Sequence, residues 1–377
     1  MKVDKTKWEK KTLGEICYIY DSQRKPVSKE NRIKGIYPYY GATGLQDYVH
    51  DYIFDGRYLL LGEDGGKWNA KENSAYIVEG KIWVNNHAHI LQFKNNIIDS
   101  YICYYLNYSD LMEYITGSIV PKLTQAKMRK IEIPIPPLTE QRAIATELDA
   151  VQKMIEGYKA QLADLDTLGQ SIFLDMFGDV VNNERKWNFV KFGSLTSSIN
   201  YGTSAPAVDG GKYKYLRMGN ITDNGHLDFQ DIKYIDIPDN EIAKYIVHKG
   251  DILFNRTNSR EKVGKTACFM EEEEMIIAGY IIRIRLNEEK SLPLYIAQAF
   301  NTPEMKSYLR RLARGSVGQA NINSKELSDI KISVPPLPLQ QQFAERVEAI
   351  ERQKELLQAQ LAEAQTLMAE RMQYYFD

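Results

Sequence analysis

Two groups of side chains in this sequence have types and spacing that could perform chemistry. Asp64, Glu79 and Lys81 follow an order suited to a metal-dependent nuclease, in which carboxylates hold Mg²⁺ and a lysine assists the attacking water. His87 and His89 alternate along a predicted strand, so their rings are expected to face the same way, but no further zinc ligands stand near them. With 48 basic and 50 acidic side chains in the chain, such a triple arises by chance, so a nuclease is kept only as an alternative.

A phosphate-binding loop and a cysteine-based site are both disfavoured. Val263-Gly264-Lys265-Thr266 resembles the end of such a loop, but Ser259 stands where the first glycine of the motif would be, so the backbone cradle is lost. Cys17, Cys103 and Cys268 are odd in number and lack Cys-x-x-Cys spacing, which favours reduced thiols over disulfides or structural zinc. The sequence therefore predicts no metal site and no catalytic residues.

An internal duplication predicts the elements that must position any site. Residues 133–138 read Ile-Pro-Ile-Pro-Pro-Leu and are followed by Gln141, while residues 332–337 read Ile-Ser-Val-Pro-Pro-Leu and are followed by Gln340. The offset between the copies is 199 residues at these two hinges and 179 residues near the start of each copy. Each copy is predicted to be a domain followed by a helix, with domains at 1–138 and 181–337 and helices at 139–180 and 338–377.

Apolar residues repeat with 4-3 spacing through both predicted helices, which is the pattern of a coiled-coil seam. The seam positions are Ile144, Leu148, Val151, Ile155, Leu162 and Leu165 in the first helix, and Phe343, Val347, Ile350, Leu357 and Leu361 in the second. Lys354 and Arg371 interrupt the second seam, and we expect them to face a partner protein. Copies that pair through one seam usually do so about a two-fold axis, so the helices are expected to pair antiparallel with pseudo-two-fold symmetry.

The globular segments predict a mixed α/β (α+β) fold with short strands. Strands are expected at 58–61, 81–84, 90–93, 251–254 and 280–285, and helices at 100–115 and 292–314. The run Glu271 to Glu274 is expected to be an exposed loop. No segment approaches the roughly 18 consecutive apolar residues of a membrane span, and the lysine-rich start lacks the apolar stretch of a signal peptide. A cytoplasmic protein without membrane contacts is predicted.

The charge of the chain is divided unevenly. Residues 140–176 and 338–377, within the two predicted helices, carry 14 acidic and 7 basic side chains, which leaves 41 basic and 36 acidic ones for the rest of the chain, where phosphates would be contacted. The loop before each hinge combines glycine, hydroxyl and amide groups with nearby cations, the groups that contact phosphates and base edges. Candidate nucleic-acid contacts are Ser118, Lys122, Thr124, Gln125, Lys127 and Arg129 before the first hinge, and Arg310, Arg314, Ser316, Gln319, Asn321 and Asn323 before the second.

The order and duplication of these motifs resemble the specificity (S) subunit of Type I restriction-modification systems, over essentially the whole chain. The motifs that carry the resemblance are the two hinges with their helices, Trp8 to Gly14, Trp187 to Gly193, Tyr39 to Gly44, Gly62 to Gly65, Asn85 to His87, and Gly250 to Phe254 with Arg256. The second domain has no clear sequence counterpart of Gly41 to Gly44 or of Asn85 to His87. By this resemblance Asn86, His87 and Arg256 join the candidate DNA contacts.

The resemblance implies two target recognition domains, each reading one half of a bipartite double-stranded DNA sequence, with the helices as a spacer. Because the domains differ, the implied target is asymmetric. The resemblance further implies a non-catalytic chain that binds no cofactor and recruits two methyltransferase (modification) subunits, which use S-adenosylmethionine for DNA methylation. In some host-defence systems two endonuclease/translocase (restriction) subunits, which use ATP and Mg, also join. Two alternatives stay open, the metal-dependent nuclease and a coiled-coil protein scaffold without DNA affinity.

Overall fold

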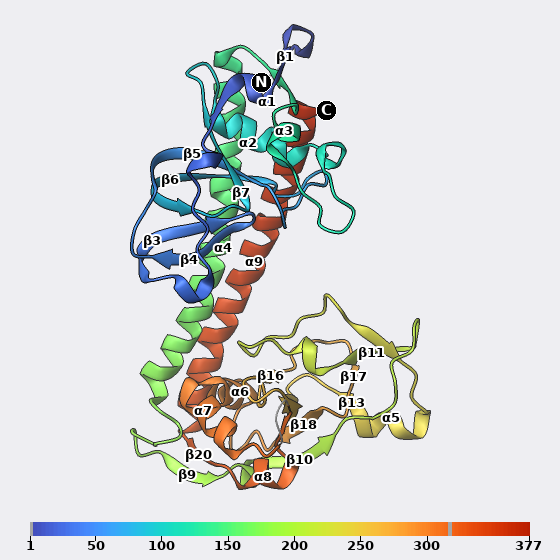
Figure 1. Cartoon of the computed structure of the whole chain (residues 1–377). Coiled ribbons are helices and arrows are strands. Elements are labelled where there is room, and N and C mark those ends of the chain that lie inside the picture. Colours follow the sequence, from blue (N-terminus) through green and yellow to red (C-terminus); the bar gives the residue numbers. More distant parts are fainter. Residues whose placement is uncertain (1–2, 316–318) are drawn as a thin grey trace. The chain divides into compact units, whose positions relative to one another are not determined.

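The computed structural model describes residues 3–315 and 319–377 and has a mixed α/β architecture (Figure 1). The chain forms two compact units, a first unit of residues 1–159 and 359–377 and a second unit of residues 160–358. Two 40-residue helices, α4 (Leu138–Phe177) and α9 (Leu337–Phe376), each contribute a segment to both units. Ser316, one of the candidate contacts, lies outside the described residues.

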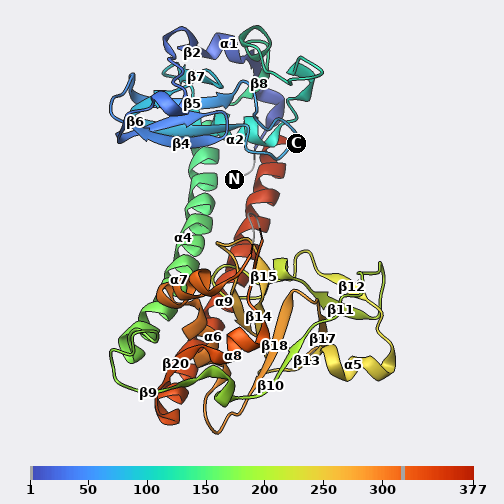
Figure 2. The same cartoon turned by 60° about the horizontal axis from the view of Figure 1, so that its bottom comes forward.

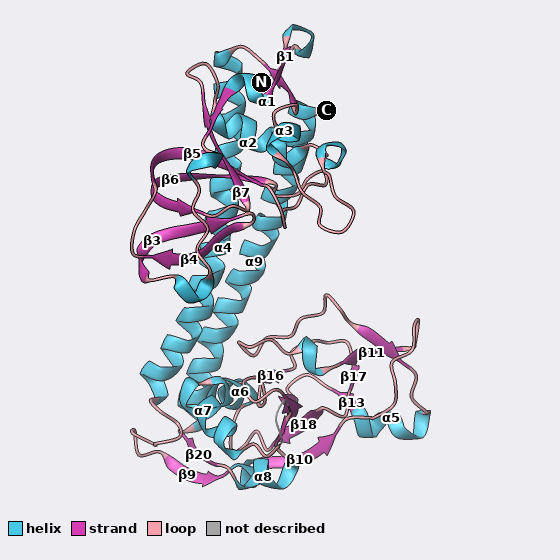
Figure 3. Ribbon diagram, in the orientation of Figure 1, coloured by secondary structure: helices cyan, strands magenta, loops and turns pink. Residues whose placement is uncertain are grey.

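The first unit is built on a six-stranded sheet with the order β2-β7-β5-β6-β3-β4 (Figures 1 and 3). Its strands are β2 (Cys17–Ile19), β3 (Lys34–Gly41), β4 (Gly44–Val49), β5 (Phe54–Gly62), β6 (Ala75–Val84) and β7 (Ala88–Phe93). Neighbouring strands are antiparallel except β3 and β6, which pair parallel. A separate antiparallel pair, β1 (Glu9–Thr12) with β8 (Glu132–Ile135), joins the start of the chain to the first hinge.

Strand β5 shows how the sequence builds the core of this unit. Successive side chains of a strand point to opposite faces of the sheet. Leu59 and Leu61 therefore join the cluster made with α2 (Asp99–Tyr108) and α4, while Leu60 joins a second cluster on the other face. Figure 2 shows α2 and the first turns of α4 on one side of the sheet. The short helices α1 (Leu13–Ile16) and α3 (Gln125–Met128) complete the unit.

The second unit contains two four-stranded sheets, with the orders β10-β18-β14-β16 and β12-β11-β17-β13. The strands are short and joined by long loops (Figure 3). Their bounds are β10 (Thr196–Tyr201), β11 (Tyr213–Leu216), β12 (Lys233–Ile235), β13 (Ile246–Val247), β14 (Ile252–Asn255), β16 (Thr266–Cys268), β17 (Met275–Ile277) and β18 (Ile281–Leu286). Two further pairs are β9 (Asn188–Lys191) with β20 (Lys331–Val334) and β15 (Thr257–Asn258) with β19 (Ala320–Asn321). The helices are α5 (Asp239–Tyr245), α6 (Pro293–Asn301), α7 (Pro303–Leu312) and α8 (Ser324–Asp329).

The two units repeat one topology. The order β2-β7-β5-β6 in the first matches β10-β18-β14-β16 in the second, with every neighbour antiparallel in both. In the second unit two strands, β16 and β17, take the place of the single strand β6. The parallel pair β3 and β6 therefore corresponds to the parallel pair β11 and β17. The exposed run Glu271 to Glu274 lies between β16 and β17, as predicted. The duplication seen in the sequence is therefore a duplication of the fold.

A difference in loop length accounts for most of the change in offset between the copies. Leu13 and Phe192 both donate a backbone hydrogen bond to the residue that precedes the last strand of their unit, Ile131 or Ile330, at 2.8 and 2.7 Å, and they are 179 residues apart. Strands β3 and β4 are joined by two residues, 42 and 43, whereas β11 and β12 are joined by residues 217–232. This longer connection explains why the second copy has no sequence counterpart of Gly41 to Gly44.

The hinges are fixed by the two duplicated glutamines, which lie inside the protein at the helix starts. Gln141 is 1% exposed, accepts the backbone N–H of Ile98 at 2.9 Å and donates to the carbonyl of Pro136 at 2.9 Å. Equivalent contacts surround Gln340, whose partners are the N–H of Leu292 and the carbonyl of Pro335, both at 2.8 Å. Each glutamine therefore ties the first turn of its long helix to the hinge prolines and to the start of a second helix.

The segments of α4 and α9 that belong to the second unit pair antiparallel. Phe343 near the start of α9 contacts Phe173 and Phe177 near the end of α4, while Lys354, further along α9, contacts Asp166, which is earlier in α4. In the first unit the end of α9 contacts the start of α4, where Tyr375 donates to Glu147 at 2.5 Å. The seam positions are buried or half-buried within their units.

The expectation that Lys354 faces a partner protein is wrong, while that for Arg371, whose side chain is half exposed, stays a prediction. Lys354 is 7% exposed and forms ion pairs with Asp166 at 2.6 Å and Glu351 at 2.9 Å. Burial opposes the charge of Lys354, but the hydrogen bonds to these carboxylates outweigh it and raise its pKa. Arg371 pairs with Glu147 at 3.0 Å. Both cations interrupt the apolar seam because a carboxylate of α4 stands opposite each of them.

The predicted strands are confirmed, because each overlaps one of β5, β6, β7, β14 and β18. The predicted helices are correct in place but too long. The segment 292–314 is two helices, since Thr302 is extended and caps α7, and Pro303 cannot continue the hydrogen bonding of α6. The segment 100–115 is helical only as far as Tyr108 and is followed by the single 3₁₀ turn Met112–Tyr114.

Candidate nucleic-acid interface

In the first unit, three segments that are far apart in the sequence meet at the end of β5. Glu63, directly after β5, donates its backbone N–H to the carbonyl of His87 at 2.8 Å and accepts the backbone N–H of Leu123 at 2.7 Å. His87 lies in the turn before β7, and Leu123 lies in the loop before the first hinge. That loop is a closed hairpin, because Thr116 and Lys122 exchange backbone hydrogen bonds of 2.9 and 2.8 Å. The sheet therefore holds in place the loop that carries most of the contacts predicted for the first unit.

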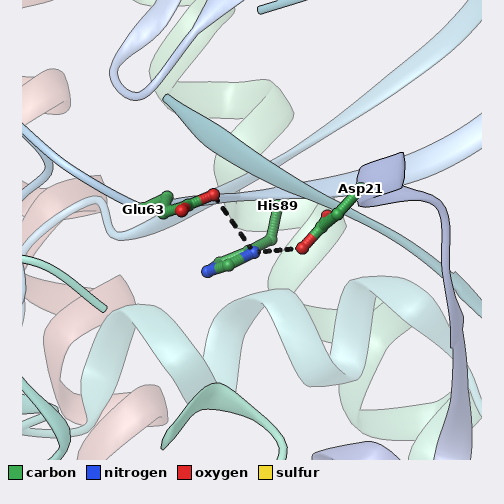
Figure 4. A group of neighbouring side chains, drawn as sticks. All are labelled: Asp21, Glu63 and His89. Carbon is green, nitrogen blue, oxygen red and sulfur yellow. Dashed lines mark hydrogen bonds and ion pairs between the residues drawn. The ribbon is translucent and has the colours of Figure 1, made fainter. Parts of the chain in front are cut away.

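A buried histidine lies at this junction. His89 of β7 forms a 2.6 Å hydrogen bond with Asp21 through Nδ1 and lies 3.6 Å from Glu63 (Figure 4). Its Nε2 lies 2.7 Å from the carbonyl oxygen of Leu123. Because a carboxylate and a carbonyl can only accept, both ring nitrogens must donate, which requires the positively charged imidazolium.

Two further cations balance the carboxylates of this ionic network. Arg24 lies 2.5 Å from Glu63 and 3.7 Å from Asp21, and Lys122 lies 2.9 Å from Glu63. Burial acts to raise the pKa of both carboxyl groups, but hydrogen bonds from His89 to Asp21 and from Lys122 and Arg24 to Glu63 outweigh it and lower both pKa values. The hydrogen bond to Glu63 raises the pKa of Lys122. Both carboxylates are therefore ionised at neutral pH, and the network links the hairpin to the sheet.

Asp21, Glu63 and His89 also have the composition of a metal site, and their ligand atoms all lie within 4.8 Å of one another. The residues do not fit a bound divalent cation, however. Arg24 and Lys122 already neutralise the two carboxylates, and each nitrogen of His89 donates to an acceptor, whereas a metal ligand needs a free nitrogen lone pair. The group is a structural ion network that shapes the loop junction.

The second unit repeats the backbone frame of this junction. Arg256 takes the place of Glu63, since its N–H donates to the carbonyl of Tyr280 at 3.0 Å and its carbonyl accepts from Ile322 at 2.9 Å. The pre-hinge loop is again closed, here by backbone hydrogen bonds of 3.0 and 2.8 Å that Arg314 exchanges with the residue before Ile322. Tyr280 therefore stands where His87 does in the first unit, although the sequences offer no match.

The side chains at the second junction are different in kind. The guanidinium of Arg256 lies over the ring of Tyr201, 4.7 Å from its centroid, and donates to Asn321 Oδ1 at 3.1 Å. A carboxylate with a lysine partner, Glu63 with Lys122, is thus replaced by an arginine with an amide partner. One frame presents two different sets of donors and acceptors.

The candidate contacts of the first unit divide into two groups. Lys122 and Gln125 belong to the junction, where Gln125 donates to Asp21 at 2.9 Å. His87 contacts Asp64 with half of its side chain exposed, and Asn86 beside it is exposed. The others lie outside this network: Thr124 caps α3 by accepting the N–H of Lys127, and Ser118, Lys127 and Arg129 are exposed.

In the second unit, Arg256 and Asn321 are brought together, while the other candidates are spread over the loop and neighbouring helices. Asn323 caps α8 by accepting the N–H of Glu326 at 2.9 Å. The exposed Arg314 forms an ion pair with the largely buried Glu326 at 2.7 Å. Arg310 at the end of α7 and Gln319 in the loop are exposed. Whether any candidate touches DNA stays a prediction.

The nuclease triple predicted as an alternative is not assembled. Strand pairing places Glu79 opposite Arg57 and Lys81 opposite Asp55, so Asp64 is seven or more residues further along, on the order of 20 Å away. Glu79 instead forms an ion pair with Arg57 at 3.0 Å. The three side chains therefore cannot share a metal ion.

Two other sequence interpretations are settled by local geometry. His87 and His89 do not face the same way, because the strand begins only at Ala88 and His87 belongs to the turn, half exposed, while His89 is fully buried. Lys265 is not a phosphate ligand, because its ammonium donates to the carbonyl of Ile221 and burial lowers its pKa. The resemblance to a phosphate-binding loop has no structural basis.

Sequence reasoning does not identify Asp21, Arg24 or Tyr201, which the topology brings to the junctions from early in each unit. Asp21 begins a short 3₁₀ turn, Asp21–Gln23, and no motif marks it. The one available signal is His89, a polar residue inside the apolar stretch Ala88 to Leu91. A buried histidine predicts acceptor partners, but not which residues supply them.

Comparison with known proteins identifies the family. The model of the Type I restriction modification DNA specificity domain matches residues 5–165 and 184–366, so this chain belongs to that family, and the two matches coincide with the two copies. The chain is 28% identical over 369 residues to the putative type I restriction enzyme specificity subunit S.HindORF215P of Haemophilus influenzae, covering 91% of this chain and 87% of that protein. It is 27% identical over 250 residues to the EcoKI specificity subunit of Escherichia coli, covering 62% of this chain and 53% of that protein.

Solved structures support the fold. The S subunit of a Type-I restriction-modification system from M. genitalium matches with a TM-score of 0.62 at 14% identity, covering 100% of this chain and 98% of that one. A second structure, from work on complex assembly and conformational transition of the type I R-M system, matches with a TM-score of 0.51 at 17% identity over 98% of this chain and 97% of that chain. At these identities the likeness shows a shared fold.

No helix within residues 3–315 and 319–377 is long and apolar enough to cross a membrane. The three cysteines are free, as predicted. Burial raises the pKa of the Cys17 thiol to about 12, so it stays protonated and unreactive at neutral pH.

Proposed function

We propose that this specificity-family chain reads an asymmetric bipartite DNA sequence, with each unit recognising one half. The observation that carries the proposal is the repeated junction, where one backbone frame presents Glu63 with Lys122 in the first unit and Arg256 with Asn321 in the second. Base pairs are distinguished by their patterns of donors and acceptors, so a constant frame with different side chains suits two readers of different half-sites. Membership of the specificity-domain family supports DNA as the ligand.

Within this proposal, exposed cations and polar side chains have separate roles. Lys127, Arg129, Arg310 and Arg314 would neutralise phosphates and position the protein, whatever the sequence. Side chains at and beside the junctions would read base edges, and these are Asn86, His87, Lys122, Gln125, Arg256, Gln319, Asn321 and Asn323. Exposed Ser118 and the helix cap Thr124 would add backbone or hydroxyl contacts to phosphates.

Helices α4 and α9 would set the distance between the half-sites. Each is 40 residues long, which at 1.5 Å per residue is about 60 Å. A rigid pair of this length would leave base pairs between the half-sites unread. The buried hinge glutamines support this role, because they fix the start of each helix to the globular part of its own unit.

The chain would act with partner subunits rather than as an enzyme by itself. Two methyltransferase (modification) subunits would dock on the two equivalent hinge and helix surfaces and would bind S-adenosylmethionine. Where restriction subunits are present, two of them would use ATP and Mg for translocation and cleavage. This chain would supply recognition without a bound cofactor, in the cytoplasm.

A selection experiment tests the proposal. The full chain, assembled with its modification subunits, is mixed with a pool of random duplexes, and the bound DNA is sequenced. We expect a motif of two short specified parts separated by a gap of fixed length. Lys122→Ala should relax only one part and Asn321→Ala only the other. Assembly without enrichment of any motif would show a protein scaffold and exclude the proposal.

A further inference from the structure

Two branched apolar side chains are held in water at the tip of the first pre-hinge hairpin. Ile119 is 94% exposed and Val120 is 65% exposed. The hairpin below them is closed by the two backbone hydrogen bonds between Thr116 and Lys122, and the hydroxyl of Thr116 adds a third to the carbonyl of Lys122 at 3.1 Å. These side chains forgo the gain of burial although the loop that carries them is ordered by its own hydrogen bonds.

The backbone of the hairpin is shaped to present this tip. Gly117 has a φ of +91°, and a Cβ built on it would lie 2.4 Å from the carbonyl oxygen of Val120. Only glycine permits both this conformation and this close approach. Pro121 follows and restricts the chain on the other side of the tip. The exposure of Ile119 and Val120 is therefore a consequence of a defined turn.

The surroundings of the tip favour a polyanion over another protein. Residues 112–131 contain one acidic side chain, Glu113, and four basic ones, Lys122, Lys127, Arg129 and Lys130. A specific protein interface engages roughly 20–30 residues a side around a buried apolar centre, whereas this tip offers two apolar residues above a basic loop. Some DNA-binding proteins insert an apolar side chain such as isoleucine or leucine between two base pairs, with cations on either side of it. The tip has this combination of apolar and basic side chains.

We propose that Ile119 and Val120 act as a wedge that enters the duplex at the half-site read by the first unit and unstacks one base step. The exposed cations that follow the hairpin, Lys127, Arg129 and Lys130, would hold the flanking phosphates. The inference rests on the proposed function, because it requires that the first unit binds a duplex. The sequence of the second copy repeats Gly-Ser-Ile as Gly-Ser-Val at residues 315–317, which lie partly outside the described residues.

The test uses the full chain with its modification subunits and short duplexes that carry the motif selected from the random pool. The fluorescent base 2-aminopurine is placed at successive positions of each half-site, and dyes at the duplex ends report bending by energy transfer. The parent complex should raise the fluorescence at one step of one half-site and bring the ends closer. Ile119→Ser with Val120→Ser should abolish both signals and weaken binding of the selected duplex about ten-fold or more.

Two controls make the result specific. Ile36→Ser removes a comparably exposed apolar side chain, 78% exposed on β3, and should leave all three readouts unchanged. Ile119→Leu keeps an apolar wedge and should retain the unstacking signal. Since the tip is exposed, the thermal midpoint of the double variant should match that of the parent.

Two results would overturn the wedge. One is a double variant that binds, unstacks and bends the duplex like the parent. The other is a double variant that no longer assembles with the modification subunits, which would make the tip a protein contact. Failure of the proposed function itself would appear earlier, as a parent complex that enriches no motif.

Discussion

At the scale of residues, the two junctions show how one backbone position is used for different chemistry. Glu63 and Arg256 make the same pair of backbone hydrogen bonds. One goes to the residue before β7 or β18, and the other goes to the pre-hinge loop. Their side chains have opposite charge and contact Lys122 and Asn321, respectively. Backbone bonds fix the loops regardless of the side chain, so the contact surface can change without loss of the fold.

The ionic network of the first junction predicts a stability that depends on pH. The pKa of Asp21 is lower in the folded protein than in the unfolded chain, so its contribution is present above pH about 4 and is lost as the pH falls through the folded value. Asp21→Asn should lower stability at pH 7 by about 2 kcal/mol, because it weakens the contacts to His89 and Gln125. Thermal unfolding at pH 7 and pH 3 measures this effect.

At pH 3 the difference between parent and Asp21→Asn should be smaller than at pH 7. Asp55→Asn serves as the control, since Asp55 is exposed on β5, and it should change the midpoint little at either pH. An Asp21→Asn effect of equal size at both pH values would show that the carboxylate charge is not what stabilises the junction.

Residues of this network could be predicted only in part. Lys122 and Gln125 were accessible to sequence reasoning because they stand in a duplicated loop beside a hinge. Asp21 and Arg24 were not, because they act through contacts across 68 and 39 residues of chain, to His89 and Glu63. Such long-range pairs follow from the sheet topology, which no local pattern encodes.

At the scale of elements, the segments of α4 and α9 in the second unit are held by a cluster of aromatic rings. Phe343 is fully buried, and its ring centroid lies 5.4 Å from those of both Phe173 and Phe177. Phe343→Ala should destabilise the second unit by about 3–5 kcal/mol, because the cavity left behind can close only in part. Urea unfolding followed by circular dichroism measures the change.

A matched change on the outside of the same helix pair separates packing from helix propensity. Leu168 on α4 is 44% exposed, and Leu168→Ala should cost no more than about 0.5 kcal/mol. Equal losses in the two variants would contradict the ring cluster as the main contact between these helix segments.

Elements were predictable where one local rule dominates. Strand β5 contains the continuous apolar run Tyr58 to Leu61, both long helices follow apolar periodicity, and the structure has all three at the expected places. The break between α6 and α7 lies at Thr302 and Pro303, inside the single helix that the sequence predicts, because proline cannot continue the hydrogen bonding of α6. The local pattern cannot place Lys354, because its counter-ion, Asp166, is on the other helix.

At the scale of the whole molecule, the duplication joins the fold to the proposed function. The two copies repeat the backbone contacts of the hinges, the backbone contacts of the loop junctions and the order of the sheet strands. They differ in the length of the connection between β11 and β12, compared with that between β3 and β4, and in the side chains at the junctions. The repeated parts would set geometry and the different parts would set sequence. The division into two similar copies could be predicted because the repeat is visible in the hinges, whereas equivalences such as His87 with Tyr280 needed the structure.

The central claim is that two independent readers are separated by a helical spacer, and a change of helix length tests it most directly. Seven residues in heptad pattern are inserted into α4 after Lys159 and seven into α9 after Gln358, where the two compact units divide. The insertion preserves the 4-3 seam and lengthens the helix pair by about 10 Å, or about three base pairs of DNA.

The assembled complex is then used to select bound duplexes from the random pool, in parallel with the parent. We predict that the gap between the two parts of the motif grows by about three base pairs while the bases read in each part stay the same. An unchanged gap, or a change in the bases read, would contradict the account.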